Sequence, residues 1–114
     1  MIDLYTLVEV VEINLYSRHK DNRTTQRYSV YGSKTKTVTN VTNFDLDNTE
    51  IWTFVGSVHS GHYQGDGGFD GVIGSSIAVP SEIGQLRYLL LVIEDAPSSN
   101  GDSTFVAEID VIIE

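Results

Sequence analysis

The basic side chains of this acidic chain are concentrated in one short window. Residues 18–36 hold six of the seven Lys and Arg residues and a single Asp, a net charge of +5, whereas the other residues hold one basic and fifteen acidic side chains, a net charge of −14. Clustered cations suit an anionic or hydroxyl-rich ligand. A solvated loop and strand face is the alternative, and the residue types alone leave both open.

Aromatic side chains near predicted loops offer a second kind of chemistry. A pyranose ring has a C–H-rich face that packs on an aromatic ring, while its hydroxyl groups bond to polar neighbours. We therefore predict a shallow carbohydrate site formed by two loops, although the sequence does not say whether these loops share one end of the molecule. The candidate ligand-binding residues are Tyr16, Arg18, His19, Arg23, Arg27, His62, Tyr63 and Phe69.

Acidic residues on turn-forming segments offer oxygen ligands for calcium. The candidates are Asp45, Asp47, Asp66 and Asp70, which do not follow the EF-hand pattern. The alternative is that these side chains cap the backbone of Gly-rich turns. His59 and His62 with Asp66 suit a transition metal only in a loop, because residues three apart on a strand point to opposite faces. We expect no cofactor, with calcium as the open possibility.

Length and composition exclude several classes of protein. A chain of 114 residues makes one domain, residues 1–114. Without cysteine it has no disulfide, thiolate zinc site or thiol nucleophile. No Gly-x-Ser-x-Gly elbow is present, and three histidines are few for a jelly-roll oxygenase, so we expect no enzyme. No segment has the length of a membrane span, and the net charge of −9 argues against nucleic acid as a partner.

The elements that must position these residues are short strands. Val11, Ile13 and Leu15 alternate with polar residues, the period of a half-buried strand, and the apolar run 89–93 indicates a central strand. We predict one helical turn at 81–84 and a core position for Trp52. The expected strands are 7–17, 26–33, 36–43, 49–57, 71–79, 85–94 and 104–113. Such a series predicts an all-β antiparallel β-sandwich or jelly roll.

The first predicted strand has a break in its alternation near residue 10. Val8 and Val10 follow one phase, whereas Val11, Ile13 and Leu15 follow the other, so both faces carry apolar residues. An apolar strand at an exposed edge invites pairing with a second chain. We therefore predict a homo-oligomer that covers this strand.

Several phrases of the sequence, in order, resemble the discoidin, or coagulation factor V/VIII type C, domain. These are Ile2-Asp3-Leu4 with Val11–Arg18, Arg27-Tyr28-Ser29-Val30-Tyr31-Gly32-Ser33, Leu86-Arg87-Tyr88 with the apolar run after it, and Ala107-Glu108-Ile109-Asp110-Val111. The resemblance implies a discoidin-like (galactose-binding-domain-like) fold. It also implies an extracellular or cell-surface, non-catalytic module that binds carbohydrate or another cell-surface ligand. The alternative function is a structural, assembly or protein–protein adhesion module.

The chain also departs from the family pattern. Family domains usually carry further residues before the acidic-Leu-Gly phrase, so we expect an N-terminally shortened relative or a fragment. Tyr5 stands where the family usually has glycine. Arg18, Asp21 and Arg27 lie in the region of the family's fucose site, but with stretched spacing, which puts a fucose site in doubt and leaves a more general glycan site.

Overall fold

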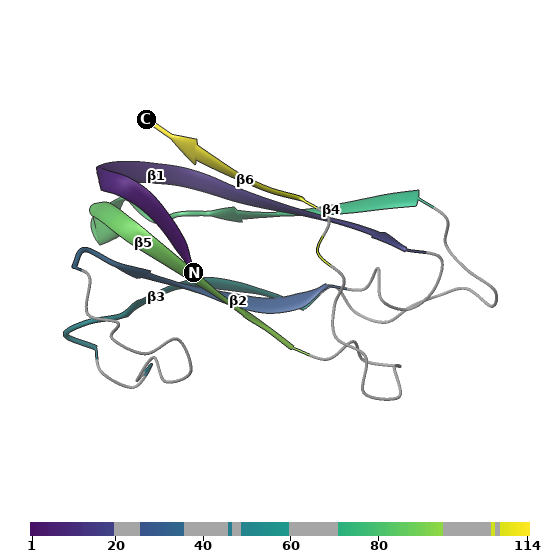
Figure 1. The fold of residues 1–114 in the computed structure, drawn as a ribbon, viewed down its shortest axis with the longest axis horizontal. Helices are drawn as coiled ribbons and strands as arrows, with labels where there is room; N and C mark the ends of the chain where they lie inside the picture. Colours follow the sequence, from purple (N-terminus) through teal and green to yellow (C-terminus); the bar gives the residue numbers. More distant parts are fainter. Residues whose placement is uncertain (20–25, 36–45, 47–48, 60–70, 95–105, 107) are drawn as a thin grey trace.

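The computed structural model describes residues 1–19, 26–35, 46, 49–59, 71–94, 106 and 108–114. These residues form an all-β fold with one turn of 3-10 helix (Figure 1). The elements are β1 (Ile2–His19), β2 (Arg27–Ser33), β3 (Thr53–His59), β4 (Gly71–Ala78), η2 (Ser81–Ile83), β5 (Gln85–Ile93) and β6 (Glu108–Ile113). In this described part of the chain, no helix is long and apolar enough to cross a membrane.

All strand pairs are antiparallel, and together they make a nearly closed, barrel-like sheet. The strand order is β3-β2-β5-β1-β4, and β6 pairs with β1 beside this path. The first half of β1 pairs with β5, and its second half pairs with β4 and β6. The two ends of the order, β3 and β4, approach each other, since a Cβ built on Gly56 would lie 2.8 Å from Ile77 Cγ2.

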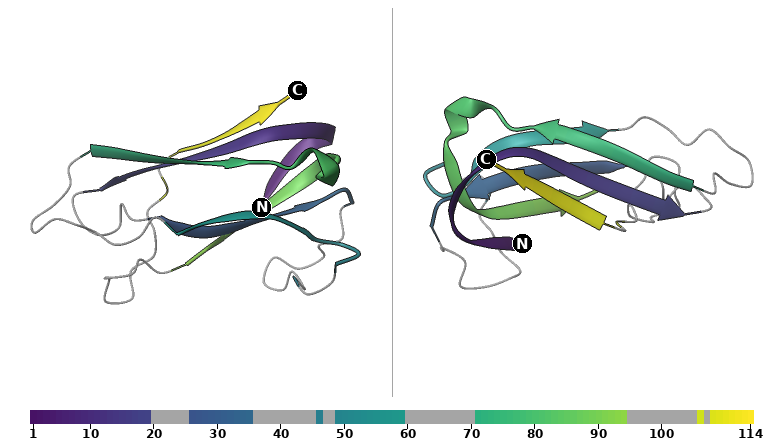
Figure 2. Two further views of the ribbon diagram at one scale, coloured as in Figure 1. Left: turned by 180° about the vertical axis from the view of Figure 1, so that it is seen from behind. Right: turned by 90° about the horizontal axis from the view of Figure 1, so that it is seen from above.

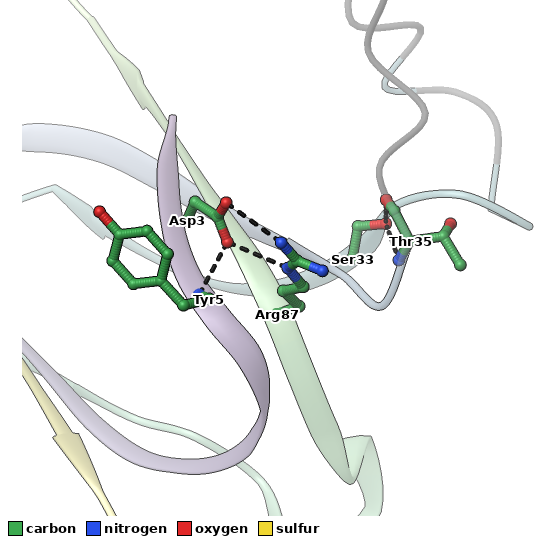
Figure 3. Close-up of polar contacts among 5 residues, drawn as sticks. All are labelled: Asp3, Tyr5, Ser33, Thr35 and Arg87. Carbon is green, nitrogen blue, oxygen red and sulfur yellow. Dashed lines mark hydrogen bonds and ion pairs between the residues drawn. The ribbon is translucent and has the colours of Figure 1, made fainter.

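The bend that carries β1 from one set of partners to the other lies at residues 4–7 (Figure 2). These four residues lie opposite a single residue of β5, Arg87. Tyr5 has a φ of 71°, the left-handed region that favours glycine. Asp3 Oδ1 accepts a hydrogen bond from the Tyr5 N–H at 2.8 Å, and the Arg87 guanidinium binds both Asp3 carboxylate oxygens at 3.1 and 3.4 Å (Figure 3). This hydrogen bonding raises the pKa of Arg87.

A bulge further along β1 resolves the break in its alternation. Val10 lies opposite Ile113 of β6 while Glu12 lies opposite Ile112, so Val11 is an extra residue. Val10 and Ile13 are therefore both buried, and Val11 is 42% exposed. Val10 of one apolar phase and Ile13 and Leu15 of the other therefore point into the core. The prediction that this strand is an exposed edge is wrong, because its second half is flanked by β4 and β6.

The core lies between the two halves of the bent sheet. It consists of Val10, Ile13, Leu15, Tyr28, Val30, Val55, Ile77, Leu86 and Leu89. Tyr28 spans the interior, and its hydroxyl group shares a 2.8 Å hydrogen bond with Ser75 Oγ of β4. Burial raises the pKa of Tyr28.

Most predicted strands are found near their expected positions. The central place of β5, between β2 and β1, is confirmed, as are the helical turn after Pro80 and the burial of Trp52, which is 2% exposed. The strand predicted at 49–57 begins later, at Thr53, and the one predicted at 104–113 is described from Glu108. The strand predicted at 36–43 lies outside the described residues. The fold is antiparallel and barrel-like, a coarser result than the predicted sandwich.

Candidate functional site

The strand ends that flank the predicted binding loops lie at one end of the barrel. β1, β3 and β5 finish at this end, and β2, β4 and β6 begin there, because every pairing is antiparallel (Figure 1). We call it the loop end. The residues between its strands, 20–25, 60–70 and 95–105, lie outside the described part of the chain.

The anchor residues of two connections are paired with one another at the loop end. The β1–β2 connection runs from His19 to Arg27, and the β3–β4 connection runs from His59 to Gly71. His19 pairs with Gly71, and Arg27 pairs with His59. Paired residues on neighbouring antiparallel strands have Cα atoms only about 4.5–5.5 Å apart. The two connections that hold most of the predicted ligand-binding residues therefore leave and re-enter the barrel side by side.

From the loop end, a band of polar and aromatic side chains runs along the outer face of β2 and β3. Tyr28 and Val30 of β2 point into the core, so their neighbours in the strand point outward. Three cross-strand pairs result: Arg27 with His59, Ser29 with Ser57, and Tyr31 with Phe54. We call these six residues the β2–β3 strip. It presents a basic pair, a hydroxyl pair and an aromatic pair in sequence along the strands.

The aromatic pair of the strip depends on an irregularity in β3. Val30 pairs with Gly56, but Tyr31 pairs with Phe54, so Val55 is an extra residue that points into the core. The Tyr31 and Phe54 rings meet edge to face, with centroids 5.6 Å apart and an interplanar angle of 71°. Phe54 is 54% exposed. This arrangement leaves ring surface open to solvent beside the serine hydroxyl groups.

The basic pair of the strip, Arg27 and His59, lies close to the end of β5. His59 Nε2 is 3.5 Å from Glu94 Oε2, and both side chains are about half exposed. The Glu94 N–H donates to the Arg27 carbonyl oxygen at 2.9 Å, which fixes the backbone of this corner. A carboxylate and an imidazole therefore lie together at the loop end, beside the backbone of Arg27, with both hydrogen-bond donors and acceptors for a hydroxyl-rich ligand.

Tyr16, another predicted ligand residue, lies on the outer face of β1, away from the β2–β3 strip. It pairs with Gly74 of β4 and with Glu108 of β6. A Cβ built on Gly74 would lie 3.2 Å from the Tyr16 ring, so this glycine leaves the space that the ring fills. On the same face, Asn14 Nδ2 donates to Glu12 Oε2 at 3.1 Å, and Ser76 Oγ donates to Asn14 Oδ1. The tyrosine is half-buried on a polar face.

The structure places four of the eight predicted ligand residues. Arg27 lies in the β2–β3 strip, Tyr16 lies on the outer face of β1, and the backbones of Arg18 and His19 lie at the loop end. The others lie outside the described residues: Arg23, His62, Tyr63 and Phe69. The predicted calcium ligands Asp45, Asp47, Asp66 and Asp70 also lie outside them. Within the described ranges, no three His, Asp or Glu side chains form a group suited to a metal ion.

The sequence pattern did not single out Tyr31, Phe54 or Glu94 as site residues. Tyr31 has a detectable signal, because it alternates with buried positions in the strand 26–33. Phe54 has no such signal, since its position opposite Tyr31 depends on the extra residue Val55. Glu94 joins the site through a pairing between strands that are far apart in sequence.

No family model, curated protein or solved structure matches this chain. The resemblance to the discoidin domain therefore stays a prediction, and the site rests on the geometry described above.

Proposed function

We propose that this protein is a non-catalytic binding module for carbohydrate and that its ligand binds at the loop end. The observation that carries the proposal is the pairing of His19 with Gly71 and of Arg27 with His59. This pairing brings the anchors of the two predicted binding loops together, which the proposed two-loop site requires. The open aromatic pair and the cluster of donors and acceptors at the same face add further support.

The chemistry of recognition follows from the residue types at this end. Aromatic rings contact the C–H face of a sugar ring, while charged and hydroxyl side chains form hydrogen bonds with its hydroxyl groups. Arg27 and the predicted loop residues Arg18 and Arg23 contribute donors, and Glu94 contributes an acceptor. None of these contacts needs a metal ion or a reacting group, so the proposal includes neither a cofactor nor catalysis.

Binding to a glycan array, with and without the basic loop residues, tests the proposal. We expect the chain to bind a defined set of glycans and the double variant Arg18→Ala, Arg23→Ala to lose most of that binding. Folding stability should change little, because exposed charges contribute about 0–1 kcal/mol each. Lys34→Ala is the matched control, since Lys34 is exposed just beyond the other end of β2.

Two results would count against the proposal. Unchanged glycan binding by the double variant would place the site away from the loop end. No glycan binding by the native protein, at concentrations where it remains folded, would remove carbohydrate as the ligand class.

The discoidin-like β-sandwich and the extracellular or cell-surface location belong to the same proposal. The bend of β1, which divides the sheet into two facing halves around one core, supports the sandwich. The location rests on the resemblance alone.

Assembly or protein–protein adhesion is a second candidate function, which a different surface supports. Val11, Ile112 and Ile113 are 42%, 44% and 53% exposed, and they lie together where β6 pairs with β1. Among the described strands, β6 has a partner on one side alone. Such an edge suits pairing with a second copy of the chain.

A further inference from the structure

We infer that the β2–β3 strip binds an extended, uncharged, β-linked oligosaccharide along its length, rather than one terminal sugar. This inference rests on the proposed function, because it takes carbohydrate as the ligand class. It adds the shape and charge of the ligand and assigns Ser29, Ser57 and the Tyr31–Phe54 pair to the site.

The length of the strip favours a chain over a single sugar. Arg27 and Tyr31 are four residues apart on β2, which corresponds to about 13 Å at a rise of about 3.3 Å per residue. That length exceeds a single pyranose ring. The three pairs follow one another on one face of two adjacent strands, with the bulge at Val55 between the serine pair and the aromatic pair, so the strip is elongated and suits an extended ligand.

The ends of the strip define the direction in which such a ligand extends. On this outer face Leu90 of β5, opposite Tyr31, is buried, and past the aromatic pair Ser33 and Tyr88 are buried as well. At the other end, His59 is about half exposed and marks the loop end. A chain stacked on Phe54 therefore continues past the serine pair toward His59 and Arg27.

Each pair suits a different part of a neutral sugar chain. The Phe54 ring offers a stacking surface, the two serines donate and accept hydrogen bonds, and His59 with Glu94 provides both kinds of hydrogen-bonding group. The net charge of −9 repels a polyanionic glycan at long range. β-1,4-Linked glucan and xylan chains are extended, whereas α-1,4-linked glucan chains curve into a helix, so an elongated strip along two strands suits the former.

Isothermal titration with oligosaccharides of increasing length tests the inference. The probes are xylo- and cello-oligosaccharides from the monosaccharide to the hexasaccharide, with malto-oligosaccharides for comparison. We expect the affinity for one β-linked series to rise at least about tenfold from disaccharide to tetrasaccharide and then level off, with little dependence on salt.

Substitutions within the strip test where the oligosaccharide binds. Phe54→Leu should weaken binding of the hexasaccharide at least about tenfold, whereas Phe54→Tyr, which keeps a ring, should retain it. His59→Ala should lower the ratio of hexasaccharide to disaccharide affinity. Tyr5→Ala is the matched control, because Tyr5 is an aromatic residue that is 83% exposed at a separate place, the bend of β1.

The outcomes separate this inference from the proposed function. If glycans bind but affinity does not rise with chain length, the inference is overturned and the carbohydrate function stands. The same holds if no β-1,4-linked chain is among the glycans that bind. Full binding by Phe54→Leu also overturns it. Absence of all glycan binding removes both.

Discussion

At the scale of single residues, Gly32 of β2 has the closest neighbour among the glycines that the structure describes. A Cβ built on this glycine would lie 2.6 Å from Leu86 Cδ1 and 2.9 Å from Leu86 Cδ2, and Leu86 is buried. Because the buried Leu86 side chain would have to shift within the core, Gly32→Ala should lower the free energy of unfolding by about 1–3 kcal/mol. Urea denaturation measures this. Gly74→Ala is the control, since its Cβ would meet only the Tyr16 ring on the outer face, and an equal loss there would contradict the explanation.

The buried Tyr28 hydroxyl group links the two halves of the barrel and should make stability depend on alkaline pH. Its pKa is raised above the ordinary 10.0, chiefly by burial. The folded protein therefore holds the phenol proton more tightly than the unfolded chain does. The resulting stability is complete below pH 10 and is lost as the pH rises through the raised folded-state pKa.

Removing this hydroxyl group tests the linkage. Tyr28→Phe should cost about 1 kcal/mol at neutral pH, because Ser75 Oγ loses its partner, and should reduce the fall in unfolding free energy above pH 10. Denaturation curves at several alkaline pH values give both quantities. Parallel pH profiles for the native protein and the variant would show that another group causes the alkaline loss.

At the scale of elements, the bend of β1 holds a residue in a conformation that its type disfavours. Tyr5 adopts a φ of 71° and is 83% exposed, so its side chain contributes little packing. A non-glycine residue in the left-handed region costs about 1–2 kcal/mol, a cost that glycine avoids. Glycine loses more backbone entropy on folding, which offsets about 0.5–1 kcal/mol of that gain. Tyr5→Gly should therefore raise the unfolding free energy by about 0.5–1 kcal/mol. A loss of stability in thermal or urea denaturation would show that the tyrosine ring has a structural role.

The central position of β5 predicts how its backbone amides exchange with solvent. β5 has hydrogen-bonded neighbours on both sides, β2 and β1, whereas β6 pairs with β1 alone among the described strands. Leu89 lies between Gly32 of β2 and Ile2 of β1, so its amide should be among the slowest to exchange, whereas that of Ile112 should exchange faster. Hydrogen–deuterium exchange followed by NMR checks this order. Rapid exchange across 89–93 would contradict the described topology.

Strand positions could be predicted from the sequence because they depend on local alternation, as at Ile13 and Leu15. The break in alternation near Val10 is equally visible in the sequence, but the bulge that accommodates it is not. A bulge at Val11 absorbs the break within a single residue, and that choice depends on the pairing with β6. Local patterns carry no information about which partner strand accepts an extra residue.

The candidate site was predictable in its chemistry and not in its assembly. The basic window and Arg27 are visible in the sequence, yet the pairing of Arg27 with His59 joins residues separated by more than thirty positions. The Tyr31–Phe54 pair depends in addition on the bulge at Val55. Register between distant strands is set by the whole core, so residue types alone could not give it.

At the scale of the whole molecule, the exposed apolar residues of β1 and β6 predict self-association. Val11, Ile112 and Ile113 are exposed beside an edge strand, and burial of such residues stabilises a dimer. We expect light scattering at micromolar concentration to give a mass above the 12.6 kDa of one chain. Ile112→Glu should shift the distribution toward monomer. A soluble 12.6 kDa species across the concentration range would contradict this prediction.

The paired anchors at the loop end also bear on how this protein can change over evolutionary time. His19 with Gly71 and Arg27 with His59 are held by the strands, so they stay together whatever the connections between them contain. Each doubling of a flexible loop costs only about 0.6 kcal/mol of closure entropy. Insertions and deletions between these anchors should therefore be tolerated far better than a change in the register that pairs them. Descendants of this chain can acquire new ligands by altering two neighbouring loops on an unchanged frame, and a selection library that varies both loops together would use the same freedom.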